Sequence, residues 1–211
     1  MTTRSIAVPL GPTQRLVLEV PAGTPELPSP LLGALAFLGQ GLEGASAGDL
    51  ARVSVKLLAH ELPPGGSAQV TVCVGDGIVA SASASSAQPF PVEESAFGRV
   101  DIVDEVEDFG VYRLRIAPTR AIPTHEHRSM DEWEYALQGE LLLQGEPFAL
   151  GEAVRWPLRH PHRWENRGAE EAVVLCIDRP RFDAHDEVVV DAAKLERCPI
   201  HFRPHFAPQS P

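Results

Sequence analysis

The sequence has few cysteines and no cysteine motif of the kind that binds metal. Three are present, Cys73, Cys176 and Cys198, and no two of them form a CxxC pair. An odd number of widely spaced cysteines argues against a disulfide framework and against a zinc site made of thiolates. We therefore expect reduced thiols that are mostly buried.

The sequence also lacks a long hydrophobic run. A membrane-spanning helix needs about 20 consecutive apolar residues, and no segment approaches that length. Residues 1–14 contain no apolar stretch like the core of a signal peptide. We expect a cytoplasmic protein without a membrane partner, and its 44% of apolar residues is enough for a hydrophobic core.

The sequence has fewer basic than acidic residues. The 18 Lys and Arg residues are outnumbered by 29 Asp and Glu residues, which gives a formal net charge of −11. This excess of negative charge repels DNA, RNA and anionic membrane surfaces on average. We expect no nucleic-acid partner, and a small molecule is the more natural ligand or substrate.

Residues 1–90 are expected to form a small α+β domain of unknown role. Residues 13–20 have the pattern of a strand, residues 31–42 that of a helix weakened by glycines, and residues 51–62 that of a strand. The GDG tripeptide at 75–77 stands between two strand-like segments and is typical of a hairpin.

The Ser- and Pro-rich segment 85–95 is the expected linker, because it has no apolar periodicity. Residues 91–190 then show short strand-like segments divided by Gly, Pro and Asn, a pattern typical of a sandwich or barrel. Residues 191–211 are expected to form a Pro- and His-containing C-terminal extension. The segments expected as strands are 98–106, 110–118, 132–150, 153–158, 162–166 and 171–177.

The stretch PTHEHRSMDEWEYALQGE contains the strongest chemical signal in the chain. His125 and His127 lie on the same side of a strand, with their backbones roughly 7 Å apart. Glu132 begins the next strand, and His162 can supply a third imidazole. Three neutral imidazoles and one carboxylate suit Fe, Mn, Co, Ni, Cu or Zn with solvent positions left over, whereas a closed structural zinc site would favour thiolates. Isolated surface histidines are the ordinary alternative, and the clustering argues against it.

These residues resemble the cupin superfamily, whose motifs are G-x5-H-x-H-x3-4-E-x6-G and G-x5-P-x-G-x2-H-x3-N. Thr119 stands where the first motif begins with Gly, and Arg159 replaces the internal Gly of the second. The resemblance covers about residues 100–180 and says nothing of residues 1–90. The remaining motif positions are matched at the family spacing by His125, His127, Glu132 and Gly139, and by Gly151, Pro157, His162 and Asn166.

The resemblance implies a mainly β protein with a C-terminal cupin jelly-roll β-barrel, preceded by the small α+β domain. It also implies that one divalent transition metal ion is held by His125, His127, Glu132 and His162, and that the protein is a homodimer. Glu134 is the nearest rival of Glu132, since both face the same way in a strand, but only Glu132 keeps the six-residue spacing to Gly139.

Glu134 is therefore a candidate general acid or base, because burial in a barrel raises the pKa of a carboxyl group. The alternative is a carboxylate that pairs with Arg113 or Arg115. Both arginines, like Arg120, are candidates for contacting an anionic substrate, with a solvated strand face as the plainer interpretation.

Other side chains are candidates for the pocket. His160 is expected at its lining or rim, and Trp164 is expected to pack in the barrel beside it. In the C-terminal extension, Cys198, His201 and His205 have the spacing C-x2-H-x3-H, but this set lacks a fourth zinc ligand.

We thus expect a metal-dependent cupin enzyme, of oxygenase, isomerase or lyase type, acting on a small organic acid or a sugar-like metabolite. The alternative is a non-catalytic module that binds or senses a metal or small ligand. A third possibility makes residues 1–90 an eroded second barrel, and the helical pattern of residues 31–42 argues against it.

Overall fold

The computed structural model describes residues 2–85, 89–196 and 200–204. The chain divides into two compact units: the first comprises the residues up to Pro89 together with Pro204 of the described chain, and the second runs from Phe90 to Arg203. Strands predominate in both units, so the protein is mainly β. Among the described residues, no helix has the length and apolar character that crossing a bilayer requires.

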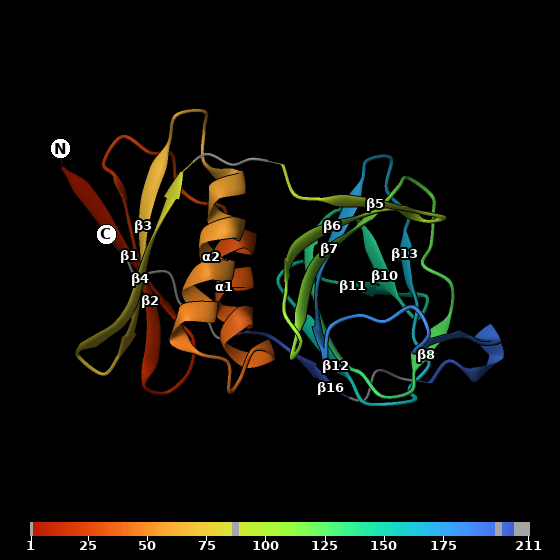
Figure 1. Ribbon diagram of the computed structural model, residues 1–211. Coiled ribbons are helices and arrows are strands. Elements are labelled where there is room, and N and C mark those ends of the chain that lie inside the picture. Colours follow the sequence, from red (N-terminus) through yellow and green to blue (C-terminus); the bar gives the residue numbers. More distant parts are fainter. Residues whose placement is uncertain (1, 86–88, 197–199, 205–211) are drawn as a thin grey trace. The chain divides into compact units, whose positions relative to one another are not determined.

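The first unit is an antiparallel sheet with two helices against one face (Figure 1). Its buried core joins sheet and helix side chains, including Leu18, Phe37, Leu58 and Val70. The strands predicted at 13–20 and on both sides of the GDG turn are present, as is the helix predicted at 31–42. The elements are β1 (Thr3–Pro9), β2 (Gln14–Pro21), α1 (Ser29–Gly41), α2 (Ala47–Glu61), β3 (Ser67–Val74) and β4 (Gly77–Ser85), with the strands in the order β1-β2-β3-β4.

The strand predicted at residues 51–62 is wrong, because this segment belongs to α2. Its buried residues, among them Val53, Leu57 and Leu58, recur with the period of a helix. The helix begins with a capping box, in which Ser46 Oγ accepts from the Asp49 N–H at 3.1 Å and Asp49 accepts from the Ser46 N–H at 3.2 Å. This cap lies before the segment whose alternation suggested a strand.

The second unit is a β-barrel built from antiparallel strands around one apolar core (Figure 1). Every strand segment predicted between residues 98 and 177 is present. A seven-stranded sheet has the order β16 (Ile200–Phe202), β12 (Ala153–Trp156), β9 (Asp131–Gln138), β14 (Ala172–Arg179), β7 (Gly110–Ile116), β6 (Gly98–Glu105) and β5 (Val92–Ser95). The smaller sheets are β11 (Glu146–Phe148), β10 (Leu141–Leu143) and β13 (Trp164–Asn166), and β15 (Glu187–Val189) with β8 (His125–His127).

The two segments expected to be irregular are partly ordered into strands. In the expected linker 85–95, residues 86–88 lie outside the described chain, whereas Val92–Ser95 forms β5 and pairs with β6. In the expected extension 191–211, Ala192–Lys194 forms a 3-10 helix and β16 pairs with β12. His201 on β16 lies 2.7 Å from Glu152 Oε2, and Cys198 and His205 lie outside the described residues.

Gly139 allows the tight passage from β9 to β10. Its φ is +94°, and a Cβ at this position would lie 2.5 Å from the Cβ of Ala172. We expect Gly139→Ala to lower the free energy of unfolding by about 2 to 4 kcal/mol, because it combines left-handed backbone strain with a steric overlap. Gly145→Ala is the matched control, since φ is +86° there but no atom lies within 4 Å of the added Cβ. Urea denaturation measures both variants. Equal losses of unfolding free energy in the two would show that the overlap with Ala172 does not contribute to the destabilisation.

Candidate metal centre

The four predicted ligands come from three places in the barrel that the backbone brings together. His125 and His127 are the first and last residues of β8, Glu132 is the second residue of β9, and His162 lies just before β13. The backbones of His125 and His162 exchange two hydrogen bonds, of 3.1 and 2.9 Å. The two halves of the predicted site therefore meet in space.

The four side chains form one buried cluster. One donor atom from each residue lies within 4.8 Å of all the others, and none of the side chains is more than 5% exposed. Glu132 Oε2 is 2.7 Å from His162 Nε2 and 3.4 Å from His127 Nε2. The His125 ring lies beside the other two, with its centroid 4.2 Å from that of His162.

The outward nitrogens of two of the three rings are held by backbone carbonyls. His125 Nδ1 is 2.8 Å from the carbonyl of Pro123, and His162 Nδ1 is 3.0 Å from the carbonyl of His160. A carbonyl can only accept, so each of these Nδ1 atoms carries the proton and donates it. The Nε2 lone pairs of His125 and His162 are thereby left to face the cluster, as metal-binding imidazoles require.

His127 is oriented by a carboxylate that the sequence did not reveal. Its Nδ1 lies 3.6 Å from Asp186 Oδ2, and Asp186 is 9% exposed. Asp186 also accepts from the N–H and the hydroxyl of Ser129, at 2.8 and 2.5 Å, and from the Arg128 N–H at 3.1 Å. One side chain thus holds the turn after β8 and places a negative charge near Nδ1 of a predicted ligand, which makes no hydrogen bond of its own.

The electrostatics of the cluster favour a positive charge. Burial alone would raise the pKa of Glu132, but His162 and His127 hold it well below its ordinary value. Burial would likewise lower the pKa of His127 and of His162, yet Glu132 raises both. Burial, followed by the neighbouring His162, lowers the pKa of His125 to about 3. The cluster therefore pairs an ionised carboxylate with two imidazoles whose pKa values it raises, and the third imidazole, His125, stays neutral.

Several of these buried donors have no hydrogen-bond partner. They are His127 Nε2, Glu132 Oε2 and His162 Nε2. A buried polar atom without a partner costs about 1 to 3 kcal/mol, so a native protein rarely retains three together without a ligand. Three imidazole nitrogens and one carboxylate oxygen are the donor set of a first-row transition metal. The residues present therefore fit such an ion.

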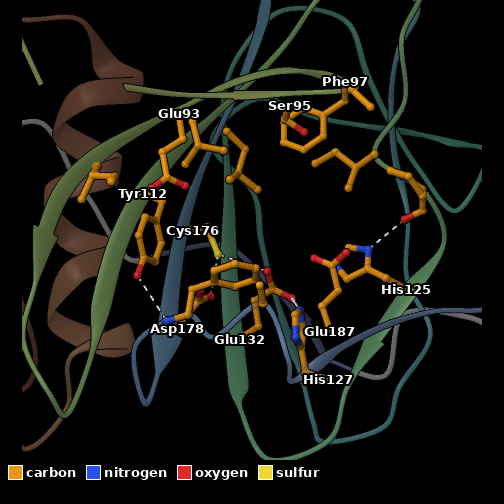
Figure 2. A pocket seen from close by; sticks show the side chains of 18 of the residues that line it. Glu93, Ser95, Phe97, Tyr112, His125, His127, Glu132, Cys176, Asp178 and Glu187 are labelled. Atoms are coloured by element: carbon orange, nitrogen blue, oxygen red, sulfur yellow. Dashed lines mark hydrogen bonds and ion pairs between the residues drawn. The ribbon is translucent and has the colours of Figure 1, made fainter. Parts of the chain in front are cut away.

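One side of the cluster borders a cavity of about 590 Å³. His125, His127 and Glu132 line it, and Figure 2 shows the two imidazoles at one side of the space. His162 does not line the cavity and closes the cluster from behind. A small molecule in the cavity would reach the donors from the side that the protein leaves open.

The model of the cupin domain family matches residues 112–178. The second unit contains a cupin domain. This confirms the resemblance predicted from the two motifs. Comparison with curated proteins gives no match.

Several solved structures are similar to part of this chain. TT1209 from Thermus thermophilus is 28% identical with a TM-score of 0.36, over 38% of this chain and 81% of that one. The capsular polysaccharide assembling protein CapF from Staphylococcus aureus is 17% identical with a TM-score of 0.44, over 50% and 34%. Oxalate decarboxylase from Lactobacillus farciminis, in a formate complex, is 19% identical with a TM-score of 0.40, over 48% and 33%. The match thus spans about a third of each of the last two proteins.

Glu134 lies inside the cupin barrel but does not line the cavity. It is 1% exposed and accepts a short hydrogen bond from the indole N–H of Trp156. Burial, and then the nearby Glu132, raises the pKa of Glu134 to about 7. The alternative that Glu134 pairs with an arginine is wrong: Arg115 Nε lies 2.7 Å and Arg113 Nε 3.7 Å from Asp101 Oδ2.

The four side chains expected at the pocket do not line the cavity. Strand alternation explains Arg113 and Arg115, because Tyr112 and Leu114 are the residues of β7 that do line it. His160 stacks on Trp156, with ring centroids 5.3 Å apart. Trp164 is fully buried and packs edge-to-face on Phe148 in the apolar core.

A second polar group in the cavity wall was not predicted. Cys176 Sγ lies 3.1 Å from Glu132 Oε1 and 3.0 Å from Asp178 Oδ1, and all three residues line the cavity. Cys176 and Cys73 are free and buried, as expected for reduced thiols. Cys176 and Asp178 are two residues apart on β14, so the same two-residue repeat that revealed the histidines was present here within an apolar run.

Both departures from the cupin motifs adopt the backbone conformation that glycine favours. Thr119 and Arg159 each have φ of +60°. Arg159 also donates its backbone N–H to the carbonyl of His127 at 2.7 Å, so this conformation supports a predicted ligand. The backbone at these two positions therefore has the conformation that the glycines of the cupin motifs would adopt, although neither residue is glycine.

We expect Arg159→Gly to stabilise the protein. Removing the left-handed strain of a non-glycine residue gains about 1 to 2 kcal/mol, and the greater freedom of glycine in the unfolded chain offsets about half of it. Urea denaturation should therefore show a gain of up to about 1 kcal/mol. A clear loss instead would mean that the exposed Arg159 side chain stabilises the fold through contacts of its own.

Proposed function

We propose that this protein is a metal-dependent enzyme whose substrate binds in the barrel cavity. The observation that supports the proposal most strongly is the set of buried donors on His125, His127, Glu132 and His162, beside a cavity of about 590 Å³. Structural metal sites are usually closed by four protein ligands that include thiolates, whereas catalytic sites keep a position open to substrate or water. The cavity supplies that open side.

A bound divalent transition metal ion would supply Lewis acidity to a substrate oxygen atom, which is compatible with oxygenase, isomerase or lyase chemistry. The chain itself contributes the orientation of the donors. The carbonyls of Pro123 and His160 fix the rings of His125 and His162, and the carboxylate of Asp186 attracts the Nδ1 side of His127 from 3.6 Å. Preorganised donors of this kind hold a substrate oxygen in one place.

The cavity lining helps to choose between the two substrate types expected from the sequence. A small organic acid would need basic side chains, and no Lys or Arg of the described chain lines the cavity. Carboxylates line it instead, including Glu93, Glu105 and Asp178. A hydroxylated metabolite without an anionic group is therefore favoured over an organic acid.

The proposal is tested by turnover of a panel of hydroxylated metabolites with protein loaded separately with Fe(II), Mn(II), Co(II), Ni(II), Cu(II) and Zn(II). We expect turnover by at least one metal form, its loss on chelation and its return when that metal is restored. The His162→Ala variant serves as the control, since it removes a donor without altering the cavity wall. Ligand-induced stabilisation without turnover across the panel would contradict the enzyme and support a binding module.

A further inference from the structure

The charge of the cavity wall is one-sided. Six of the residues that line the cavity are carboxylates, and within the described chain His125 and His127 are its only residues with a basic side chain. Glu132 faces the metal donors, and strand alternation turns the Glu94 side chain to the face of β5 opposite that of Glu93, which leaves four carboxylates for a ligand to meet. The acidic residues of the lining are Glu93, Glu94, Glu105, Glu132, Asp178 and Glu187.

A divalent ion would not reverse this charge. Two positive charges at the metal centre, less one from Glu132, leave a single positive charge there. Burial first, and the neighbouring Glu132 as well, raise the pKa values of Asp178 and Glu187, which reduces their share of negative charge. Even without those two, the carboxylates of Glu93 and Glu105 outweigh the single positive charge left at the centre. The wall therefore repels anions and attracts cations.

Aromatic rings accompany the carboxylates. Phe97, Tyr112 and Phe182 line the cavity, and the Tyr112 hydroxyl donates to Glu105 Oε1 at 2.6 Å. In Figure 2, Glu93 and Tyr112 lie on the side of the space away from His125 and His127. The face of an aromatic ring attracts ammonium groups, most of all where water is partly excluded. Glu93 and Tyr112 thus stand apart from the donors, whereas Phe182 and Glu187 lie beside His127.

We propose that the cavity binds a small organic cation that also carries a hydroxyl or carbonyl oxygen. The ammonium group lies among the carboxylates and aromatic rings, and the oxygen points to the side of His125 and His127. The position of the oxygen rests on the proposed metal centre. The preference for a cation does not, because the acidic and aromatic side chains supply it whether or not a metal is bound.

The test compares three probes of similar size. Choline is a hydroxylated cation, 3,3-dimethylbutan-1-ol has nearly the same shape without the charge, and 3-hydroxy-3-methylbutanoate is a hydroxylated anion. Binding is measured by calorimetry on Zn(II)-loaded and on metal-free protein, and by the visible spectrum of the Co(II) form. We expect choline to bind at least about tenfold more tightly than the neutral alcohol, and the anion most weakly. The choline preference should decrease as salt is added.

Matched charge variants separate the cavity from the net charge of the protein. Glu93→Gln should weaken choline binding by about three- to fivefold and leave the neutral alcohol unaffected. Glu146→Gln removes the same charge on β11, outside the cavity, and should change neither affinity. Equal effects of the two variants would contradict a local interaction.

The outcomes distinguish the two proposals. Choline preference with a change in the Co(II) spectrum supports both. Choline preference in a protein that retains no metal supports the cation site and contradicts the metal-dependent enzyme. A metal-loaded protein that binds the anion as tightly as choline, or binds none of the three probes, contradicts the inference and leaves the metal centre intact.

Discussion

Replacing Glu132 with Gln should lower the affinity for Zn(II) or Co(II) by about 100-fold or more, since loss of one partner from a buried charge pair costs about 3 kcal/mol or more. Glu132 is the only carboxylate among the four clustered donors, and its Oε2 lies 2.7 Å from His162 Nε2. An amide keeps the shape but removes the charge that a divalent cation needs. Competition with a chromophoric chelator measures the change.

Glu134→Gln is the matched control for that experiment. It makes the same chemical change two residues along the same face of β9, but the Glu134 carboxylate is held by the indole of Trp156. We expect its metal affinity to fall by less than about threefold, because a buried group outside the coordination sphere loses no metal bond. The reverse pattern would mean that Glu134 and not Glu132 binds the metal.

Asp186→Asn should lower the metal affinity by about 10- to 100-fold without unfolding the protein. Asp186 faces Nδ1 of His127 at 3.6 Å, and its carboxylate favours the tautomer that directs the Nε2 lone pair at the metal. The amide of Asn presents an N–H as well as an oxygen, so it weakens this preference while still accepting from Ser129. The measurement combines chelator competition with the ¹⁵N chemical shifts of the His127 ring.

Asp183→Asn provides the comparison for Asp186. Asp183 lies in the same segment after β14, and its carboxylate accepts from the backbone N–H of His185 at 2.9 Å without contacting the donors. Its metal affinity and ring shifts should match those of the unaltered protein. Equal losses in both variants would show that the segment acts through its general stability and not through His127.

The four clustered donors could be predicted because they follow simple local rules. His125 and His127 share a face through the two-residue repeat of a strand, and the spacing to Gly139 selects Glu132 over Glu134. The structure brings all four donors together. Their meeting depends on the pairing of His125 with His162, which the motif resemblance implied and periodicity alone could not show.

Other parts of the site depend on contacts between distant segments. Asp186 reaches His127 because β15 pairs with β8, and no local pattern in the sequence announces that pairing. Arg113 and Arg115 were expected at the pocket because their charge suggested a ligand, but strand alternation turns them towards Asp101 on β6. Residues 51–62 were predicted as a strand because their apolar and polar residues partly alternate. The capping signal of the helix is at Ser46, which lies outside that segment.

The acidic lining of the cavity also depends on segments that only the fold brings together. Its carboxylates come from β5, β6, β9, β14 and β15, which are far apart in the sequence. The net charge of −11 gave no indication that so many acidic side chains would gather around one space. Only the closed barrel shows that the ligand side of the metal centre is negative.

Elemental analysis of the purified protein, beside a His125→Ala/His127→Ala double variant, tests the metal centre most directly. We expect about one equivalent of a first-row transition metal in the unaltered protein after reconstitution, and its loss in the double variant. His201→Ala is the control, because His201 pairs with Glu152 on the surface and not with the cluster. Equal metal content in the double variant, or none in the reconstituted protein, would contradict a metal centre built from these four residues.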